Sequence, residues 1–238
     1  MDVVKMHLPE GHPNRPGTKL SALKAVVVHY TQNDEPGATD TMNVRYIGRK
    51  WETGKYWIKS KGTAVEGPIE AGSMGKGDNG LGIQFRYGSA HVFCDMNSVT
   101  EAIPLDEVSW NCGDKNYKGG YQRIAEKVFK RRQNFETVAV EICNNDVIKN
   151  SLVDWDASVA NAKQWIINYL TAYNLSVDLQ GSLTPQTVDE PPAPGTVLLL
   201  RHYDITGKLC PKPFLDHAHD WENFVKEIAG QVNRDERA

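Results

Sequence analysis

The sequence predicts an α/β fold with a site at one edge of its sheet. Apolar runs at residues 25–30, 137–143 and 197–200 have the length and composition of buried strands. Two other segments, 154–173 and 216–232, repeat apolar residues at the spacing of a helix. The first run carries His29 near its end, and the last run ends in Arg201 and His202. We therefore expect imidazole side chains at the carboxyl ends of two core strands.

Composition excludes several classes of protein. The chain has 238 residues, 40% of them hydrophobic and 24% charged, which is ordinary for a soluble globular protein. A net charge of −3 does not indicate a basic surface for nucleic-acid binding, and no apolar stretch is long enough for membrane insertion. The first ten residues lack a signal-peptide core, so we expect a protein that is cytoplasmic when made. Its four cysteines form no C-x-x-C pair and are expected to be reduced thiols.

The N-terminal part is expected to be an arm, a strand and a helix. Residues 1–24 carry few apolar groups and are interpreted as an extended arm over the domain surface. After the first strand, residues 39–51 are predicted to form a short helix with Met42, Tyr46 and Ile47 on one face.

Residues 52–88 are rich in glycine, with short apolar segments at 56–58 and 82–85. We interpret this region as an insertion of loops and short strands, because so short a segment rarely holds a core alone. A β-hairpin is predicted next, with strands at 90–95 and 98–103 around a turn.

The strand at 137–143 contains one charged residue, Glu141. A carboxylate in an apolar strand costs free energy unless it is paired, linked to a metal or exposed at the strand end. Glu141 is therefore a candidate for a perturbed pKa and for proton transfer. The alternative is a structural ion pair with Arg201 or Lys208.

The C-terminal part is expected to hold two helices around a loop and the last strand. The first helix, 154–173, begins at Asp154 or Asp156 as its cap. Its predicted buried stripe is Trp155, Val159, Ala162, Ile166, Leu170 and Tyr173. Four prolines predict a long loop over 178–196. In the last helix, 216–232, the inward side chains are expected to be Trp221, Phe224, Val225 and Ile228.

A candidate metal site follows the last strand. His202 and Cys210 lie eight residues apart across a predicted loop, and imidazole nitrogen and thiolate sulfur are the ligands that zinc prefers. His29, at the end of the first strand, would be a third ligand. Three protein ligands with one open position are typical of a catalytic zinc. Lys208 lies close enough in sequence to stabilise negative charge there. The alternative is a packed loop with a buried cysteine.

These residues occur within motifs that span nearly the whole chain. In order, the motifs are Arg15-Pro-Gly-Thr-Lys-Leu20, Val26-Val-Val-His-Tyr-Thr31, Ser89-Ala-His-Val-Phe93, Ile103-Pro104 with Trp110-Asn-Cys-Gly113, Val138-Ala-Val-Glu-Ile-Cys143, and His202-Tyr-Asp-Ile-Thr-Gly-Lys-Leu-Cys-Pro211. The sequence resembles the zinc N-acetylmuramoyl-L-alanine amidases of the amidase-2 type, the group that includes the peptidoglycan recognition proteins. The resemblance implies a mixed central β-sheet flanked by helices, with zinc in a groove at its edge. It also implies one amidase domain over residues 1–238.

The resemblance implies roles for single residues. His29, His202 and Cys210 match the zinc ligands. Glu141 matches the group that takes a proton from the attacking water, and Lys208 matches the group that stabilises the transition state.

Two departures from the family pattern are present, and two neighbouring residues are expected to bind substrate. Asn111 stands where the family usually has histidine, and Ala90 stands where some members have a catalytic tyrosine. His91, which directly follows Ala90, is expected to have a hydrogen-bonded structural role. Trp110 and Asn111 are expected to contact substrate, with Trp110 stacking on a sugar face.

The implied function is hydrolysis of the amide bond between N-acetylmuramic acid and L-alanine in bacterial peptidoglycan. The missing signal peptide favours a phage or prophage endolysin that acts on the cell wall after release. The alternative is a non-catalytic, zinc-containing module that binds peptidoglycan through the same fold. Such relatives tend to lose the cysteine ligand, and this chain retains Cys210. A third interpretation is a zinc hydrolase that acts on a different amide.

Overall fold

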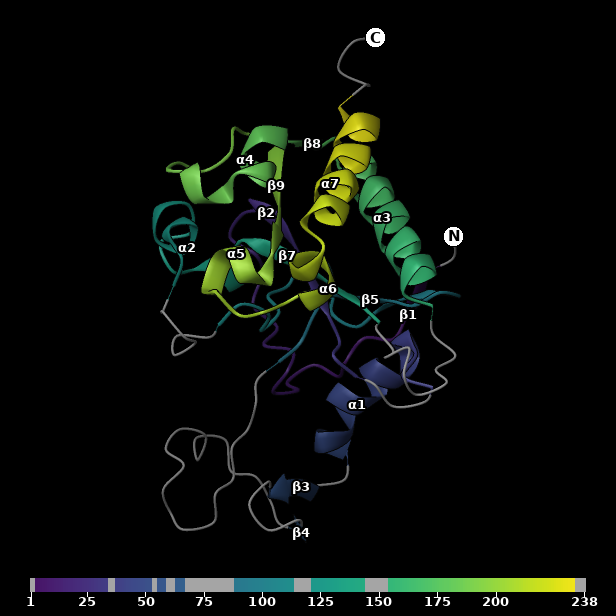
Figure 1. Ribbon diagram of the computed structural model, residues 1–238. Helices are drawn as coiled ribbons and strands as arrows, with labels where there is room; N and C mark the ends of the chain where they lie inside the picture. Colours follow the sequence, from purple (N-terminus) through teal and green to yellow (C-terminus); the bar gives the residue numbers. More distant parts are fainter. Residues whose placement is uncertain are drawn as a thin grey trace.

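One mixed β-sheet lies at the centre of the molecule. The computed structural model describes residues 3–33, 37–52, 55–58, 63–66, 88–113, 121–143 and 154–233 (Figure 1). The sheet has seven strands in the order β1-β6-β5-β7-β2-β9-β8, and only the β5–β6 pair is antiparallel. Its strands are β1 (Val3–Lys5), β2 (Ala25–Tyr30), β5 (Val92–Cys94), β6 (Val99–Glu101), β7 (Thr137–Ile142), β8 (Ser176–Val177) and β9 (Thr196–Arg201). This sheet confirms the predicted mixed α/β class.

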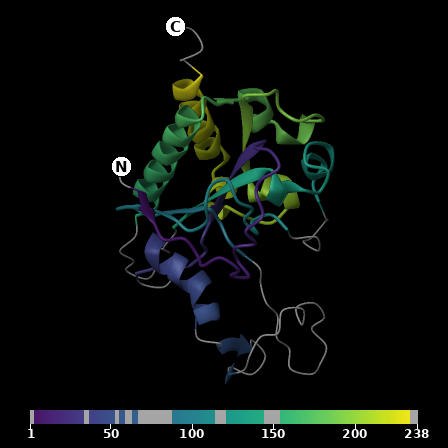
Figure 2. The same ribbon diagram turned by 180° about the vertical axis from the view of Figure 1, so that it is seen from behind.

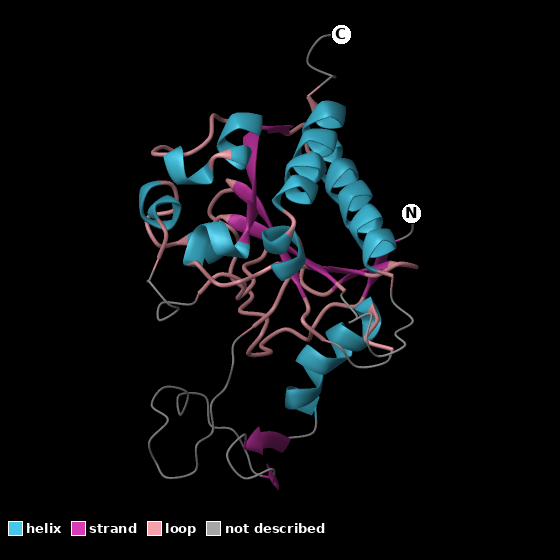
Figure 3. Ribbon diagram, in the orientation of Figure 1, coloured by secondary structure: helices cyan, strands magenta, loops and turns pink. Residues whose placement is uncertain are grey.

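Helices flank the sheet, as Figure 3 shows. They are α1 (Asp40–Glu52), α2 (Arg123–Lys127), α3 (Trp155–Ala172), α4 (Leu179–Leu183), α5 (His202–Thr206), α6 (Lys212–Asp216) and α7 (Ala218–Val232). Two short 3-10 helices, η1 (Gln133–Phe135) and η3 (Pro185–Thr187), complete the described helical segments. No helix in the described ranges is long and apolar enough to cross a membrane.

Alternating residues of the central strands pack on two different layers. Val26 and Val28 of β2 lie in the same apolar cluster as residues of α3 and α7. Ala25 and Val27 point to the opposite face, where they pack with α2 and with Ile205 of α5. Because side chains alternate along a strand, His29 shares the face of Ala25 and Val27. The candidate site therefore lies on the α2 and α5 side of the sheet.

The N-terminal segment, expected to be an extended arm on the surface, begins as an exposed edge strand of the sheet. β1 pairs in parallel with β6 at the edge, and the pairing continues to Leu8, whose N–H bonds the carbonyl of Ala102. In Figure 2, seen from behind, β1 is the purple strand at the edge of the sheet, above α1. Leu8 is buried, and Arg15 is held by a buried ion pair with Glu107. A three-residue edge strand is too short to show a periodic pattern.

The predicted helix at 39–51 is confirmed as α1, and most of its predicted apolar face points outward. Met42 and Tyr46 are exposed, whereas Val44 is buried and Ile47 packs beside it. The pair at 42 and 46 does share one helix face, but that face points outward. Tyr173 was predicted to belong to the buried stripe of α3, but it lies past the end of that helix and is exposed.

The predicted loop over 178–196 contains α4 and η3 and is wrong in that respect. Asp178 caps α4, since its carboxylate accepts the N–H of Gly181 at 2.8 Å. A hydrogen bond links α4 to β9, since Ser182 Oγ accepts the N–H of Leu199 at 2.9 Å. Gly181 allows this approach, since a Cβ there would come within 2.7 Å of the Leu198 side chain.

The remaining predicted elements are confirmed in outline. The β5–β6 pair is the predicted hairpin, and Asp154 caps α3 by accepting the N–H of Ala157 at 3.1 Å. The four inward side chains of the last helix are buried, although that helix begins at Ala218. In the predicted insertion, β3 (Lys55–Ile58) and β4 (Thr63–Glu66) form a separate antiparallel pair. The predicted segment at 82–85 lies outside the described residues.

Candidate metal centre

Parallel pairing brings the two strand-end histidines to the same edge of the sheet. β2 and β9 are parallel neighbours, with Val28 opposite Arg201. His29 is the next residue of β2, and His202 is the first residue of α5, directly after β9. The chain then turns back at Gly207 and brings Cys210 to the same place. The prediction that these three side chains converge is confirmed.

The three side chains form a compact, buried group. Their possible ligand atoms all lie within 4.8 Å of one another. His29 Nδ1 is 3.8 Å from Cys210 Sγ, and the two imidazole rings are 4.7 Å apart between centroids. Zinc bonds of about 2.0–2.3 Å to nitrogen and sulfur place tetrahedral ligands at roughly these separations. The group is therefore a candidate metal site.

The chemistry of the group fits a cation. Both ring nitrogens of His202 are buried and have no hydrogen-bond partner among the residues that the structure describes. Burying such an imidazole costs folding free energy unless a hydrogen bond or a metal ion satisfies its ring nitrogens. Burial lowers the pKa of His202 to about 3, with a smaller effect from Lys208. Burial likewise holds the pKa of His29 well below its usual value, so both rings are neutral and can bind a metal.

The helix α5 fixes the position of His202. Asp204 accepts the backbone N–H of Arg201 at 2.8 Å and forms an ion pair with the Arg201 guanidinium, also at 2.8 Å. The other end closes because Gly207 adopts φ 78° and its N–H bonds the carbonyl of Tyr203. The sequence analysis expected a loop here and missed this helix. An acidic residue in the first turn and a glycine after the last turn were the signals that could have identified it.

Glu141 lies beside His29 in the sheet. The two residues are register partners on β7 and β2, so both side chains point to the same face. One carboxylate oxygen of Glu141 is buried and has no hydrogen-bond partner among the described residues. Burial raises the pKa of Glu141 to about 7, and the Lys208 ammonium opposes this rise. Arg201 pairs with Asp204 instead, which removes one of the two structural partners considered for Glu141.

Lys208 acts electrostatically on three residues of the site, namely His29, His202 and Glu141. Its charge lowers the pKa values of His29 and His202 and opposes the rise in the pKa of Glu141. The site thus combines two neutral imidazoles, a thiol, a carboxyl group with a pKa near neutrality and a cation. Such a set can hold a metal, move a proton and stabilise negative charge.

The side chains of Trp110 and Asn111 are held by contacts within the protein. The Trp110 indole donates to the carbonyl of Pro13 at 3.1 Å and packs edge-on against Phe135. The Asn111 amide donates to Ser109 Oγ at 2.9 Å and to Thr137 Oγ1 at 3.3 Å.

Cys112 was missed by sequence reasoning, although it directly follows Asn111. Its sulfur lies 4.0 Å from His29 Nε2.

His91 is a structural residue, as predicted. It is fully buried, its Nδ1 accepts the N–H of Ala139 at 2.9 Å, and its Nε2 lies 2.8 Å from the carbonyl of Glu107. Both nitrogens are thus occupied, and burial lowers the pKa of His91 to about 4. These contacts leave His91 no free nitrogen for a metal.

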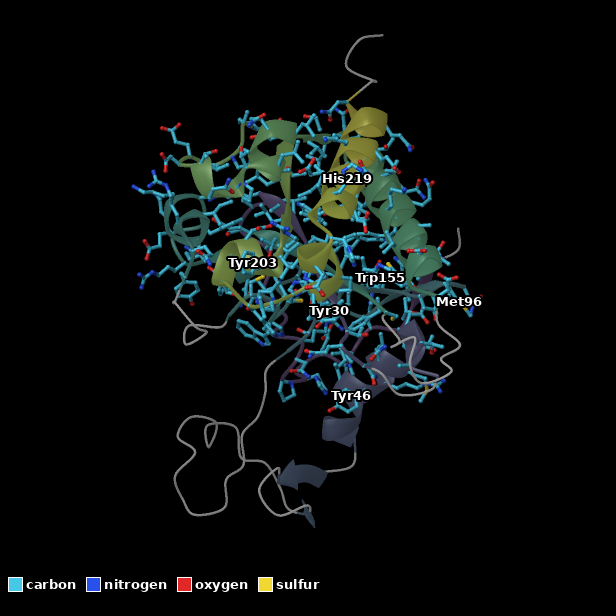
Figure 4. The ribbon with its side chains drawn as sticks, in the orientation of Figure 1. Tyr30, Tyr46, Met96, Trp155, Tyr203 and His219 are labelled. Atoms are coloured by element: carbon cyan, nitrogen blue, oxygen red, sulfur yellow. The ribbon has the colours of Figure 1, made fainter. Side chains whose placement is uncertain are left out.

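Exposed side chains lie next to the candidate ligands in sequence. Tyr203, which follows His202, is 36% exposed, and Leu209, which precedes Cys210, is 57% exposed. Figure 4 labels Tyr203 on α5 and Tyr30, the last residue of β2. The Arg201 guanidinium lies 5.9 Å from the Tyr203 ring centroid, in a cation–π contact. Tyr203 and Leu209 could contact a bound molecule.

Comparisons with known proteins agree with this geometry. The family model described as N-acetylmuramoyl-L-alanine amidase matches residues 19–213. The chain is 26% identical to the N-acetylmuramoyl-L-alanine amidase CwlL of Bacillus licheniformis over 226 residues, which is 95% of this chain and 46% of that protein. It is 23% identical to the N-acetylmuramoyl-L-alanine amidase BlyA of Bacillus subtilis over 231 residues, 95% of this chain and 47% of that protein. The chain thus spans about half the length of these relatives.

Solved structures share the fold. The catalytic domain of XlyA, a protein of Bacillus subtilis, superposes with a TM-score of 0.58 at 20% identity, covering 94% of this chain and 99% of that domain. PlyL superposes with a TM-score of 0.54 at 18% identity, covering 96% of this chain and 97% of that one. At this level of identity the superpositions establish the architecture.

Proposed function

Because this chain belongs to the N-acetylmuramoyl-L-alanine amidase family, we propose that it is a zinc amidase of bacterial peptidoglycan. The bond cleaved is the amide between N-acetylmuramic acid and L-alanine. The observation that carries the proposal is the buried group His29, His202 and Cys210, with Glu141 in register beside it. A role as an endolysin is part of the proposal, because a similar solved structure is described as an endolysin from Bacillus subtilis.

Zinc is the metal that this donor set favours. His29, His202 and Cys210 supply two neutral imidazoles and one thiolate, and three protein ligands leave one position open for water or substrate. A bound zinc would supply Lewis acidity toward the amide carbonyl and would make an attacking water more acidic. The orphaned nitrogens of His202 support this assignment, because no described residue satisfies them.

Glu141 is proposed to move the proton. Its carboxylate takes a proton from the attacking water and passes it to the leaving amine. Both steps require a pKa near the working pH, and burial raises the pKa of Glu141 to about 7. The unpaired oxygen of Glu141 supports this role, since a carboxylate in a structural ion pair would be occupied.

Lys208 is proposed to stabilise the negative charge that develops on the carbonyl oxygen. Its ammonium acts on the pKa of Glu141 and on those of both histidines, which supports a position facing the reacting atoms. One well-placed donor of this kind typically contributes about 3 kcal/mol to catalysis.

Substrate contacts and domain extent stay predictions. Tyr203 and Leu209 are exposed beside the ligands and suit contact with a muramyl peptide. We also propose one amidase domain for residues 1–238, which the pairing of β1 with β6 supports at the N-terminal end.

Digestion of purified peptidoglycan tests the proposal. The zinc-loaded protein should release peptides with a new N-terminal alanine and leave the glycan strands intact, as read by mass analysis. Cleaved glycan, or a cut elsewhere in the peptide, would assign the site to a different bond. Retained binding to peptidoglycan with no product would favour the non-catalytic module.

A further inference from the structure

The rear nitrogen of His29 needs an acceptor. A metal-bound imidazole typically donates its other N–H to an acceptor, which fixes the tautomer and the ring orientation. His29 turns Nδ1 toward the candidate ligands, 3.8 Å from Cys210 Sγ. Its Nε2 points instead toward Cys112, whose sulfur is 4.0 Å away. The acceptor must therefore come from the chain around residues 111 and 112.

The amide of Asn111 has a fixed orientation. Its nitrogen donates to Ser109 Oγ at 2.9 Å, to the Ser109 carbonyl at 3.3 Å and to Thr137 Oγ1 at 3.3 Å. Its backbone is held as well, since Asn134 Oδ1 accepts the N–H groups of Asn111 and Cys112 at 3.2 and 2.7 Å. With the nitrogen satisfied on one side, the side-chain oxygen must face the other way.

That oxygen is an unused buried acceptor. Asn111 is 9% exposed, and its Oδ1 has no hydrogen-bond partner among the described residues. Asn111 directly precedes Cys112, the residue toward which His29 Nε2 points. Burial lowers the pKa of His29 the most, and the Asn111 side chain acts in the opposite direction, as a neighbouring acceptor would. An orphaned acceptor and an imidazole that needs an acceptor thus lie side by side.

We infer that Asn111 Oδ1 accepts the Nε2–H of His29 and so holds this imidazole in the tautomer that binds zinc through Nδ1. Asn111 is then a positioning residue behind the metal ligand, in place of the substrate contact expected from the sequence. An amide oxygen is a stronger acceptor than a thiol sulfur, which favours Asn111 over Cys112. The inference rests on the proposed zinc site and is independent of which amide bond is cleaved.

Zinc affinity of the whole chain, measured by competition with a chromophoric chelator, tests this inference. Asn111→Leu keeps the shape but removes the acceptor, and should weaken zinc binding about 10–100-fold. Asn111→Asp keeps an acceptor oxygen and should bind zinc at least as tightly as the wild type. Cys112→Ala is the control for the sulfur and should stay within about threefold of the wild type. Asn111→Ala replaces the leucine variant if that one does not fold.

The outcomes separate the possible failures. Wild-type affinity in both Asn111→Leu and Asn111→Ala would overturn the inference, as would a loss of zinc in Cys112→Ala alone. If the Asn111 variants show a raised KM for a soluble muropeptide and an unchanged zinc affinity, Asn111 contacts substrate instead. A wild-type chain that binds no zinc would overturn the proposed zinc site together with this inference.

Discussion

Glu141 and His29 lie in register on neighbouring strands, and their side chains differ in the contacts that their polar atoms make. His29 turns its two ring nitrogens toward the sulfurs of Cys210 and Cys112, whereas Glu141 keeps one buried oxygen without a partner among the described residues. A buried, unpaired carboxylate lowers the stability of a fold, so its presence in a core strand requires another reason. Proton transfer supplies that reason, and two measurements on Glu141 test it.

Glu141→Gln should retain zinc and lower single-turnover hydrolysis at least about 100-fold, the usual contribution of a general base. The amide preserves the shape of the side chain but cannot accept the proton of water. Zinc content and single-turnover rate should be measured on the same preparation. Activity near that of the wild type would assign Glu141 a structural role.

Stability against pH gives a second view of the same residue. Its folded-state pKa of about 7 lies above the ordinary value of 4.5, so burial favours the protonated form. The metal-free protein should therefore lose stability as pH rises from 5 to 8, by on the order of 1–3 kcal/mol from this group. Glu141→Gln should flatten that loss in chemical denaturation of the metal-free chain. A variant that is less stable than the wild type at pH 8 would support a structural ion pair with Lys208.

Lys208→Ala should keep the fold and the zinc but lower turnover about 100-fold, because the cation acts on charge that appears only in the transition state. Lys212→Ala is a matched control, since Lys212 follows the same loop and pairs with Asp216 on the surface. The comparison is made on kcat. Equal turnover in the two variants would remove Lys208 from the mechanism.

At the scale of elements, long buried segments were predictable and short ones were not. The strands β2, β7 and β9 are continuous apolar runs because helices cover both sheet faces, and α3 and α7 are long enough to show helical spacing. The helices α4, α5 and α6 have five residues each, about one and a half turns, and no periodicity can develop over that length.

The same contrast explains what was predicted of the site. His29 and His202 could be assigned because each follows a readable strand, and parallel pairing then brings them together. Cys112 and the orientation of Asn111 could not be assigned. They approach His29 from the loop between β6 and α2, and local sequence patterns do not specify where such a loop packs.

The helix α5 gives a prediction at this scale. Asp204→Ala removes the acceptor of the Arg201 N–H and leaves the Arg201 guanidinium without its ion pair. Because His202 begins this helix, the variant should lose about 1–3 kcal/mol of stability and also bind zinc more weakly. Asp154→Ala removes the cap of α3 instead and should lower stability by about 1 kcal/mol with unchanged zinc affinity. Equal zinc affinities in the two variants would show that the Asp204 contacts at the start of α5 do not influence zinc binding.

At the scale of the molecule, the N-terminal segment is held to the domain by β1 and by the ion pair of Arg15 with Glu107. Arg15 donates through Nε and Nη2 to the carboxylate of Glu107, and its Nη1 donates to the carbonyl of Leu8. Both partners of the ion pair are almost fully buried. The overall architecture was predictable because the family motifs span nearly the whole chain. The position of the N-terminal segment was not, because it depends on one buried ion pair and one short strand.

Arg15→Ala should lower the free energy of unfolding by about 3–5 kcal/mol, because it leaves the Glu107 carboxylate buried without its partner. Arg123→Ala breaks a surface ion pair with Asp189 and should cost at most about 1 kcal/mol. Denaturant unfolding of both variants compares the two pairs directly. A loss of less than 1 kcal/mol for Arg15→Ala would show that the N-terminal segment is dispensable for stability.

The central claim is that His29, His202 and Cys210 hold a catalytic zinc. The most direct measurement is the zinc content of the purified chain, determined together with its rate of peptidoglycan hydrolysis before chelation, after chelation and after zinc is restored. The account predicts one zinc per chain, loss of hydrolysis when the zinc is removed, and recovery of hydrolysis with zinc. Undiminished hydrolysis by the metal-free chain would contradict it.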